Sequence, residues 1–133
     1  RDEYITKYRP EYPALQYVNR YLPQNARLLF IFLGKRGYYC DRNYILDTHS
    51  EVTKLYTIFK EANGPHEVWT ALKNRKITHL IIQLHLFNGW VNDLFSGKKR
   101  QLVENFFKEH TSLLYCRNDI GVFRVKECLY ISR

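Results

Sequence analysis

The sequence predicts an α/β fold: a layered sandwich in which helices flank a mostly parallel central sheet, completed by a C-terminal antiparallel hairpin. Residues 28–33 and 78–84 are runs with almost no charged side chain, which indicates strands that are buried on both faces. Helical patterns separate these runs, and strands separated by helices favour a layered sheet. A turn around Asn118-Asp119 between two apolar segments predicts the hairpin.

The composition predicts one soluble domain over residues 1–133. With 45% hydrophobic and 26% charged residues, the chain has the balance of a folded protein rather than a disordered one. Its longest apolar run is far shorter than the ~20 residues that cross a bilayer. The chain contains no methionine and no signal-peptide pattern. We interpret it as a segment cut from a longer polypeptide.

The first elements are predicted to be a helix, a strand, a turn and a short strand. Apolar residues recur at three- and four-residue steps over 12–22, which indicates an amphipathic helix that ends before Pro23. The strand at 28–33 then leads into a glycine turn at 34–37. Residues 44–46 are at most a short second strand.

The middle of the chain is predicted to hold two helices and an irregular segment. Asp47 to Ser50 offer N-cap residues for a helix over 50–62, and Asn63-Gly64 suits its end. A second helix begins at Pro65, in the favoured first-turn position. Residues 86–99 mix aromatic side chains with Asn and Gly, so we expect a loop with one helical turn or more.

A last helix is predicted at 100–110, before the hairpin. Leu102, Val103, Phe106 and Phe107 give this helix an inward face. The two hairpin strands are expected at 113–116 and 122–125. No internal repeat or linker divides the chain, which supports a single domain.

The net charge makes phosphates plausible partners. Lys and Arg number 21 against 13 Asp and Glu, a net charge of +8. The positive charge is scattered, with its densest cluster at Lys98–Arg100, and no nucleic-acid-binding motif accompanies it. This disfavours nucleic acid as a partner. The alternative function is a cytosolic nucleotide- or nucleic-acid-binding module that uses Lys35, Arg36 and the 98–100 cluster.

Two short segments are candidates for ligand contact. The glycine turn could present backbone N–H groups and two cations to a phosphate, although its spacing matches neither the P-loop nor the dinucleotide fingerprint. The tyrosines, carboxylate and arginine that follow suit sugar recognition, because rings stack and charged groups make directional hydrogen bonds. A solvated turn and half-buried tyrosines at a sheet edge are the plainer alternatives. The predicted ligand-binding residues are Lys35, Arg36, Tyr38, Tyr39, Asp41 and Arg42.

A membrane or partner surface is predicted around one tryptophan and the basic cluster. Trp90, Lys98, Lys99 and Arg100 combine an amphipathic ring with cations, a composition found at membrane surfaces. Packing of the aromatic segment into the core is the alternative.

No catalytic residue, metal site or cofactor is predicted. The five histidines lack metal-ligand spacing, and no Ser, Cys or Thr lies in a nucleophile motif. Cys116 and Cys128 would be too far apart across the predicted hairpin to form a disulfide. Pairing of Cys40 with either of them stays open.

The order of these patterns resembles the extracytoplasmic C-terminal domain of bacterial membrane glycosyltransferases related to the dolichyl-phosphate-mannose protein mannosyltransferases. Four pieces carry the resemblance: YPALQYVNRYLP at 12–23, RLLFIFLGKRGYYCDRNYILD at 27–47, ITHLII at 77–82 and FFKEHTSLLYCRNDIGVFRV at 106–125. They are hydrophobic and aromatic scaffold patterns without a catalytic signature.

The resemblance implies a non-catalytic accessory domain that follows transmembrane helices, on the periplasmic face of the bacterial inner membrane. Such enzymes use a polyprenyl-phosphate sugar, and their catalytic carboxylate lies in a loop outside this segment. The implied role is to position the acceptor or the membrane active site. The implied partners are the transmembrane part of the same polypeptide and lipid-phosphate head groups or a glycan or protein acceptor.

Overall fold

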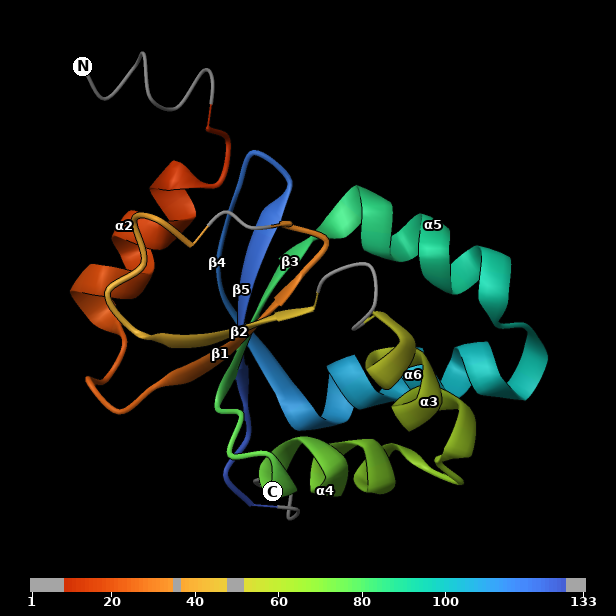
Figure 1. Ribbon diagram of the computed structural model, residues 1–133. Helices are drawn as coiled ribbons and strands as arrows, with labels where there is room; N and C mark the ends of the chain where they lie inside the picture. Colours follow the sequence, from red (N-terminus) through yellow and green to blue (C-terminus); the bar gives the residue numbers. More distant parts are fainter. Residues whose placement is uncertain (1–8, 35–36, 48–51, 129–133) are drawn as a thin grey trace.

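The computed structural model describes residues 9–34, 37–47 and 52–128, which form a five-stranded sheet with helices on both faces (Figure 1). The strand order is β2-β1-β3-β5-β4. The strands are β1 (Arg27–Ile31), β2 (Asn43–Asp47), β3 (His79–Gln83), β4 (Thr111–Arg117) and β5 (Ile120–Val125). The helices are α2 (Tyr12–Tyr21), α3 (Val52–Glu61), α4 (Pro65–Asn74), α5 (Leu84–Leu94) and α6 (Gly97–His110).

The sheet is mixed, which corrects the expected mostly parallel sheet. Strand β1 pairs in parallel with both β2 and β3, whereas β5 pairs antiparallel with both β3 and β4. The C-terminal hairpin therefore joins the sheet through its second strand. The sheet therefore has two parallel and two antiparallel pairs of strands.

Strands β1 and β3 are buried on both faces, as their apolar runs predict. Leu28 and Phe30 contribute to the core under α2, whereas Leu29 and Ile31 contribute to the core under α3 to α6. Ile81, in the central strand β3, has no exposed surface. Helix α2 lies on one face of the sheet and the other four helices on the opposite face (Figure 1).

The N-terminal helix follows its predicted pattern. Pro13 occupies the first turn of α2, where the missing N–H leaves no hydrogen bond unmade. Ala14, Leu15 and Val18 are completely buried against the sheet. The helix ends at Tyr21, just before Pro23, as expected.

The predicted loop at 86–99 is wrong, because most of this segment is helical. Helix α5 begins directly after β3, and the Gln83 side chain caps it by accepting a hydrogen bond from the Leu86 N–H at 2.9 Å. Phe87 and Val91, one helical turn apart, are buried. Asn and Gly have poor helix propensity, and Gln is an unusual N-cap, so local patterns pointed to a loop.

The remaining elements are close to their predicted positions. Helices α3, α4 and α6 lie within the predicted segments or a few residues beyond them, while the Thr48–Ser50 part of the proposed cap lies outside the described residues. In the hairpin turn, Asn118 and Asp119 have φ angles of 54° and 64°. Both residue types tolerate this left-handed conformation, which matches the twist of a two-residue hairpin. In the part of the chain described, no helix has the length and apolarity to cross a membrane.

Replacement of Ile81 by alanine is expected to destabilise the protein by about 2–5 kcal/mol, because it leaves a cavity in the central strand. Urea unfolding measures this change. Leu113→Ala is the matched control: Leu113 lies on β4 with 56% of its surface exposed, so its loss should change stability by less than about 1 kcal/mol. Equal effects of the two substitutions would contradict the described core.

Candidate functional site

The loop that contains the predicted sugar-binding residues is fastened to α2. The Asn19 Nδ2 group donates to the Tyr39 carbonyl at 2.6 Å, and Asn19 Oδ1 accepts from the Asp41 N–H at 2.7 Å. Residues 37–42 run alongside α2 in Figure 1. One helical side chain thus fixes the backbone on both sides of Cys40. Asn19 is not among the predicted site residues, because its only local signal is an amide next to the buried face of α2.

Arg42 caps the C-terminal end of α2. Its Nη2 donates to the carbonyls of Asn19 and Leu22 at 2.9 and 2.8 Å, and its Nε donates to the Pro23 carbonyl at 2.9 Å. Only 7% of Arg42 is exposed. The guanidinium therefore satisfies carbonyls that the helix leaves unpaired. The structure shows Arg42 bound to these carbonyls. Its predicted contact with a ligand stays a prediction.

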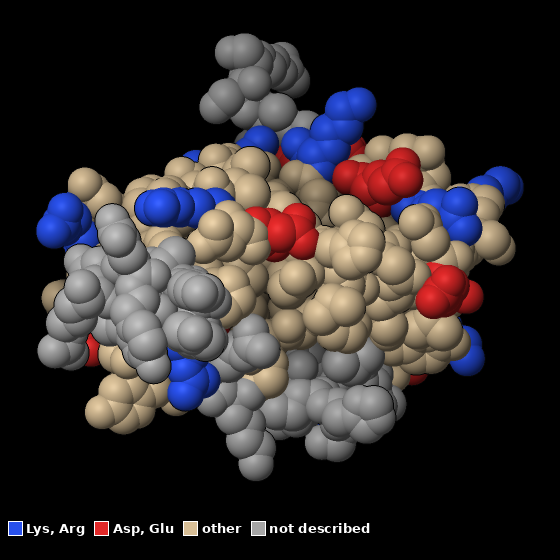
Figure 2. Space-filling model, turned by 90° about the horizontal axis from the view of Figure 1, so that it is seen from above, with Lys and Arg blue, Asp and Glu red and all other residues tan. Residues whose placement is uncertain are grey.

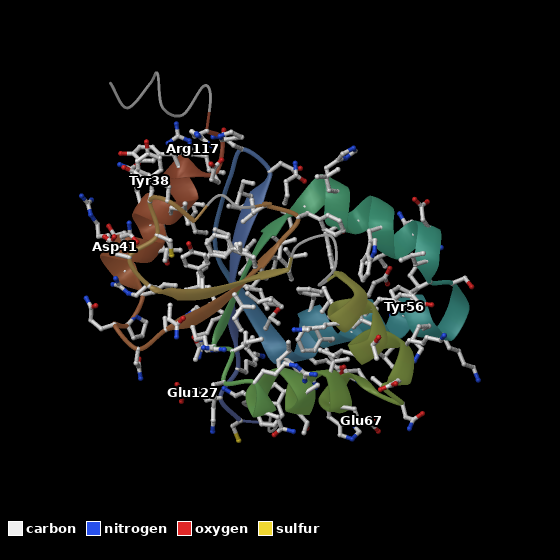
Figure 3. All side chains as sticks on the ribbon, in the orientation of Figure 1. Tyr38, Asp41, Tyr56, Glu67, Arg117 and Glu127 are labelled. Atoms are coloured by element: carbon white, nitrogen blue, oxygen red, sulfur yellow. The ribbon has the colours of Figure 1, made fainter. Side chains whose placement is uncertain are left out.

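Tyr38, Tyr39 and Asp41 form the outer part of this loop. Tyr38 is 89% exposed, and its ring meets that of Tyr39 edge to face at 4.9 Å. Tyr39 in turn meets Tyr12 edge to face at 4.8 Å. Asp41 is exposed, and Figure 3 shows Tyr38 and Asp41 on the α2 side of the sheet. An exposed ring on a fastened backbone, near a carboxylate, can stack on a sugar and accept its hydroxyl hydrogen bonds.

A second group of tyrosines lies along the same helix. The Tyr17 ring stacks on Tyr115 of β4 at 4.7 Å and lies 4.9 Å from the Tyr21 ring. Tyr21 is 64% exposed. Aromatic rings therefore extend from the 37–42 loop along α2 to β4. We call this the tyrosine face, made up of Tyr12, Tyr17, Tyr21, Tyr38, Tyr39 and Tyr115.

Gly37 allows this loop to pass close to β2. A Cβ atom on Gly37 would collide with the ring of Tyr44, which itself stacks on Phe30 at 4.7 Å. A larger residue at this position would force the Tyr44 ring to move, so the close approach favours glycine. Lys35 and Arg36 lie outside the described residues, so their predicted role in phosphate binding stays a prediction.

The predicted membrane or partner surface is mostly engaged within the fold. Trp90 is half-buried in an aromatic cluster, with its ring 5.7 Å from Phe95 and 5.9 Å from Phe87. The Lys99 ammonium donates to two carbonyls at the end of α3, those of Lys60 and Ala62, at 2.8 and 2.7 Å. These contacts are the ones expected from the alternative interpretation, in which the aromatic segment packs into the core.

Arg100 plays the same part at the end of α5. Its Nη2 donates to the carbonyls of Asn92 and Phe95 at 3.2 and 3.0 Å. Lys98 is exposed. On the face seen in Figure 2, basic and acidic side chains are interspersed and the basic ones form no continuous patch. The proposed surface role of Trp90 and residues 98–100 is not tested by these contacts and stays a prediction.

The possible metal ligands and the thiols of the described residues lie apart from one another. Among residues 9–34, 37–47 and 52–128, no three His, Cys, Asp or Glu side chains come together as a possible metal site. Cys40, Cys116 and Cys128 are free thiols, and burial raises the pKa of Cys40. A less nucleophilic, protonated thiol is the consequence.

His79 is the most perturbed of these groups. Burial, followed by the charges of Arg124 and Lys73, lowers its pKa from 6.5 to about 4. Its Nδ1 lies 2.7 Å from the Thr78 hydroxyl oxygen, which also accepts from the Arg27 N–H. The imidazole is therefore neutral at physiological pH, and it belongs to the contact between β1 and β3.

Comparison with known proteins gives a structural likeness but no sequence match. No protein-family model matches the sequence, and no curated protein sequence matches it significantly. The structure is similar to the crystal structure of the C-terminal globular domain of an oligosaccharyltransferase from Archaeoglobus fulgidus, with a TM-score of 0.54 and 16% sequence identity. The match covers 86% of this chain and 96% of the archaeal domain. The two domains share a fold.

This oligosaccharyltransferase-like fold agrees in part with the resemblance seen in the sequence. The archaeal neighbour is the C-terminal domain of an oligosaccharyltransferase, and the family that the sequence resembles also consists of glycosyltransferases. The archaeal domain is not one of the bacterial protein-mannosyltransferase relatives, so that narrower assignment remains an expectation.

Arg42→Gln is expected to destabilise the protein by about 2–4 kcal/mol, because carbonyls at the end of α2 lose a charged donor in a buried position. Urea unfolding measures the loss. Arg20→Gln removes an exposed arginine of the same helix and serves as the control, with an expected change below about 1 kcal/mol. A similar small effect for both would show that the cap contributes little.

Acidification is expected to destabilise the fold partly through His79. Its folded pKa lies below the unfolded value of 6.5, so the unfolded state binds the extra proton between about pH 6.5 and pH 4. The free energy of unfolding should therefore fall as the pH falls through this window. His79 should account for a loss on the order of 2 kcal/mol at pH 4.5. Urea unfolding at pH 7 and 4.5 measures the loss, which should be smaller in His79→Gln. An identical loss in both proteins would contradict the assignment.

Proposed function

We propose that this chain is an accessory domain, without catalytic residues of its own, in a membrane glycosyltransferase that uses a polyprenyl-phosphate sugar. The observation that carries the proposal is the likeness to an oligosaccharyltransferase C-terminal globular domain, which covers 86% of this chain and 96% of that domain. The sequence resemblance to bacterial membrane glycosyltransferases supports the same class. In this proposal the domain lies on the periplasmic face of the inner membrane, beside the transmembrane part of its own polypeptide.

The tyrosine face is the surface best suited to position the acceptor. It presents the exposed rings of Tyr38 and Tyr21, with Asp41 nearby in the same fastened loop. Because Asn19 and Arg42 fix the loop backbone, the rings can bind a glycan or a glycosylated segment with little ordering cost. The chemistry of transfer belongs to the membrane-embedded part of the enzyme.

The test uses the full-length protein in membranes, supplied with a radiolabelled polyprenyl-phosphate sugar and extracted acceptor. Tyr38→Ala combined with Asp41→Ala is expected to raise the KM for the acceptor by about ten-fold, the loss of roughly 1.4 kcal/mol of binding, without changing the KM for the donor. Leu86→Ala, which removes another exposed side chain on the opposite helical layer, is the control and should change neither.

The same assay defines what would overturn the proposal. The 133-residue chain alone should transfer no sugar. Turnover by this chain would contradict an accessory role. A full-length reading frame without several apolar stretches of about 20 residues would contradict the proposal that the enzyme spans a membrane.

A further inference from the structure

A cavity on the helical layer opposite the tyrosine face combines apolar walls with positive charge. Its volume is about 260 Å³, and it lies between β1, β2, α3 and α4. Seven aliphatic side chains line it, among them Leu29, Leu55, Leu72 and Ile77. The remaining lining residues are Arg27, Lys54 and Arg75. The described lining contains no carboxylate, so three cations face one apolar space.

The cations are not neutralised within the described fold. No ion pair among the described residues involves Lys54 or Arg75, and the one hydrogen bond of the Arg75 side chain, 2.9 Å from Nη1 to the Ala71 carbonyl, leaves its other donors available. Arg27 has a buried Nε with no hydrogen-bond partner in the described structure. Buried donors are usually paired, so this atom lacks the acceptor that such a position normally has.

The position of Arg27 follows from the strand alternation. It is the first residue of β1 and shares the sheet face of Leu29 and Ile31, so its side chain lies on the side of α3 and α4. Lys54 lies on α3 and Arg75 directly follows α4. Both residues also line an adjoining depression of about 530 Å³. Glu61 and Glu67 lie in that depression, outside the cavity itself. The positive rim is therefore next to solvent and the apolar walls lie deeper.

We propose that this cavity binds a small anion with a short apolar tail. The head, a phosphate or a carboxylate, accepts hydrogen bonds from the guanidinium groups of Arg27 and Arg75 and is attracted by Lys54. The tail packs against Leu55, Leu72 and Ile77. The volume holds about nine atoms of the size of a water molecule, which corresponds to an eight-carbon chain rather than a long lipid. The site is independent of the proposed glycosyltransferase role.

The test is isothermal titration of the 133-residue chain with octyl phosphate, octanoate, octanol and inorganic phosphate at low salt. Octyl phosphate or octanoate should bind at least about ten-fold more tightly than octanol and inorganic phosphate, because head and tail both contribute. The preferred head distinguishes a phosphate ligand from a fatty acid. Methyl NMR shifts confined to Leu55, Leu72 and Ile77 should locate the tail.

Matched variants separate this site from general charge. Lys54→Gln with Arg75→Gln, both exposed positions, should weaken octyl phosphate or octanoate about ten-fold while leaving octanol unchanged. Arg20→Gln with Lys98→Gln removes the same charge elsewhere and should change affinity less than about two-fold. Octanol binding as tightly as the anions, equal losses in both double variants, or no binding of either anion at millimolar concentration would overturn the proposal.

Discussion

The burial of β1 and β3 on both faces is the constraint on which this structure depends. Their side chains alternate between two cores, so the sheet requires a helical layer on each side. Four described helices share one face, whereas α2 is the one described helix on the other. The stability of this core therefore depends on the few contacts that hold α2 in place. The hydrogen bonds of Arg42 and Asn19 are such contacts, because they join the end of α2 to the chain that leads into β2.

Three of the 21 Lys and Arg residues bind the C-terminal ends of helices. Arg42, Lys99 and Arg100 each donate to carbonyls at the C-terminal end of a different helix, namely α2, α3 and α5. Such ends carry the negative pole of the helix dipole and unpaired acceptors. Lys99 and Arg100 lie in the first turn of α6, where a positive charge is unfavourable to their own helix. Their contacts with the ends of neighbouring helices offset that cost. A net charge of +8 therefore overstates how much cation is available to partners.

The sequence was sufficient where local pattern and burial agree. The apolar runs predicted β1 and β3, and the spacing of apolar residues predicted α2, α3, α4 and α6. Helix α5 was missed because its signal, Phe87 and Val91 with a Gln83 cap, is set among poor helix formers. Strand pairing was missed because neighbouring strands are chosen by packing across the whole sheet. The same holds for the candidate site. The exposure of Tyr38 is what a turn predicts, whereas Arg42 binds carbonyls about 20 residues earlier in the chain, which no local pattern indicates.

The two proposed binding regions are separated by the sheet, and this has a consequence for how they could influence each other. The tyrosine face lies on the α2 side, and the cavity lies under α3 and α4. Strand β1 belongs to both regions, because Arg27 begins it and the fastened loop comes after its end. A ligand that pairs the buried Arg27 Nε would stabilise the start of β1 without touching the tyrosines. Binding at one region could change affinity at the other only if β1 and β2 had two alternative arrangements. A close-packed sheet leaves little room for a second arrangement. The two sites should therefore bind their ligands independently.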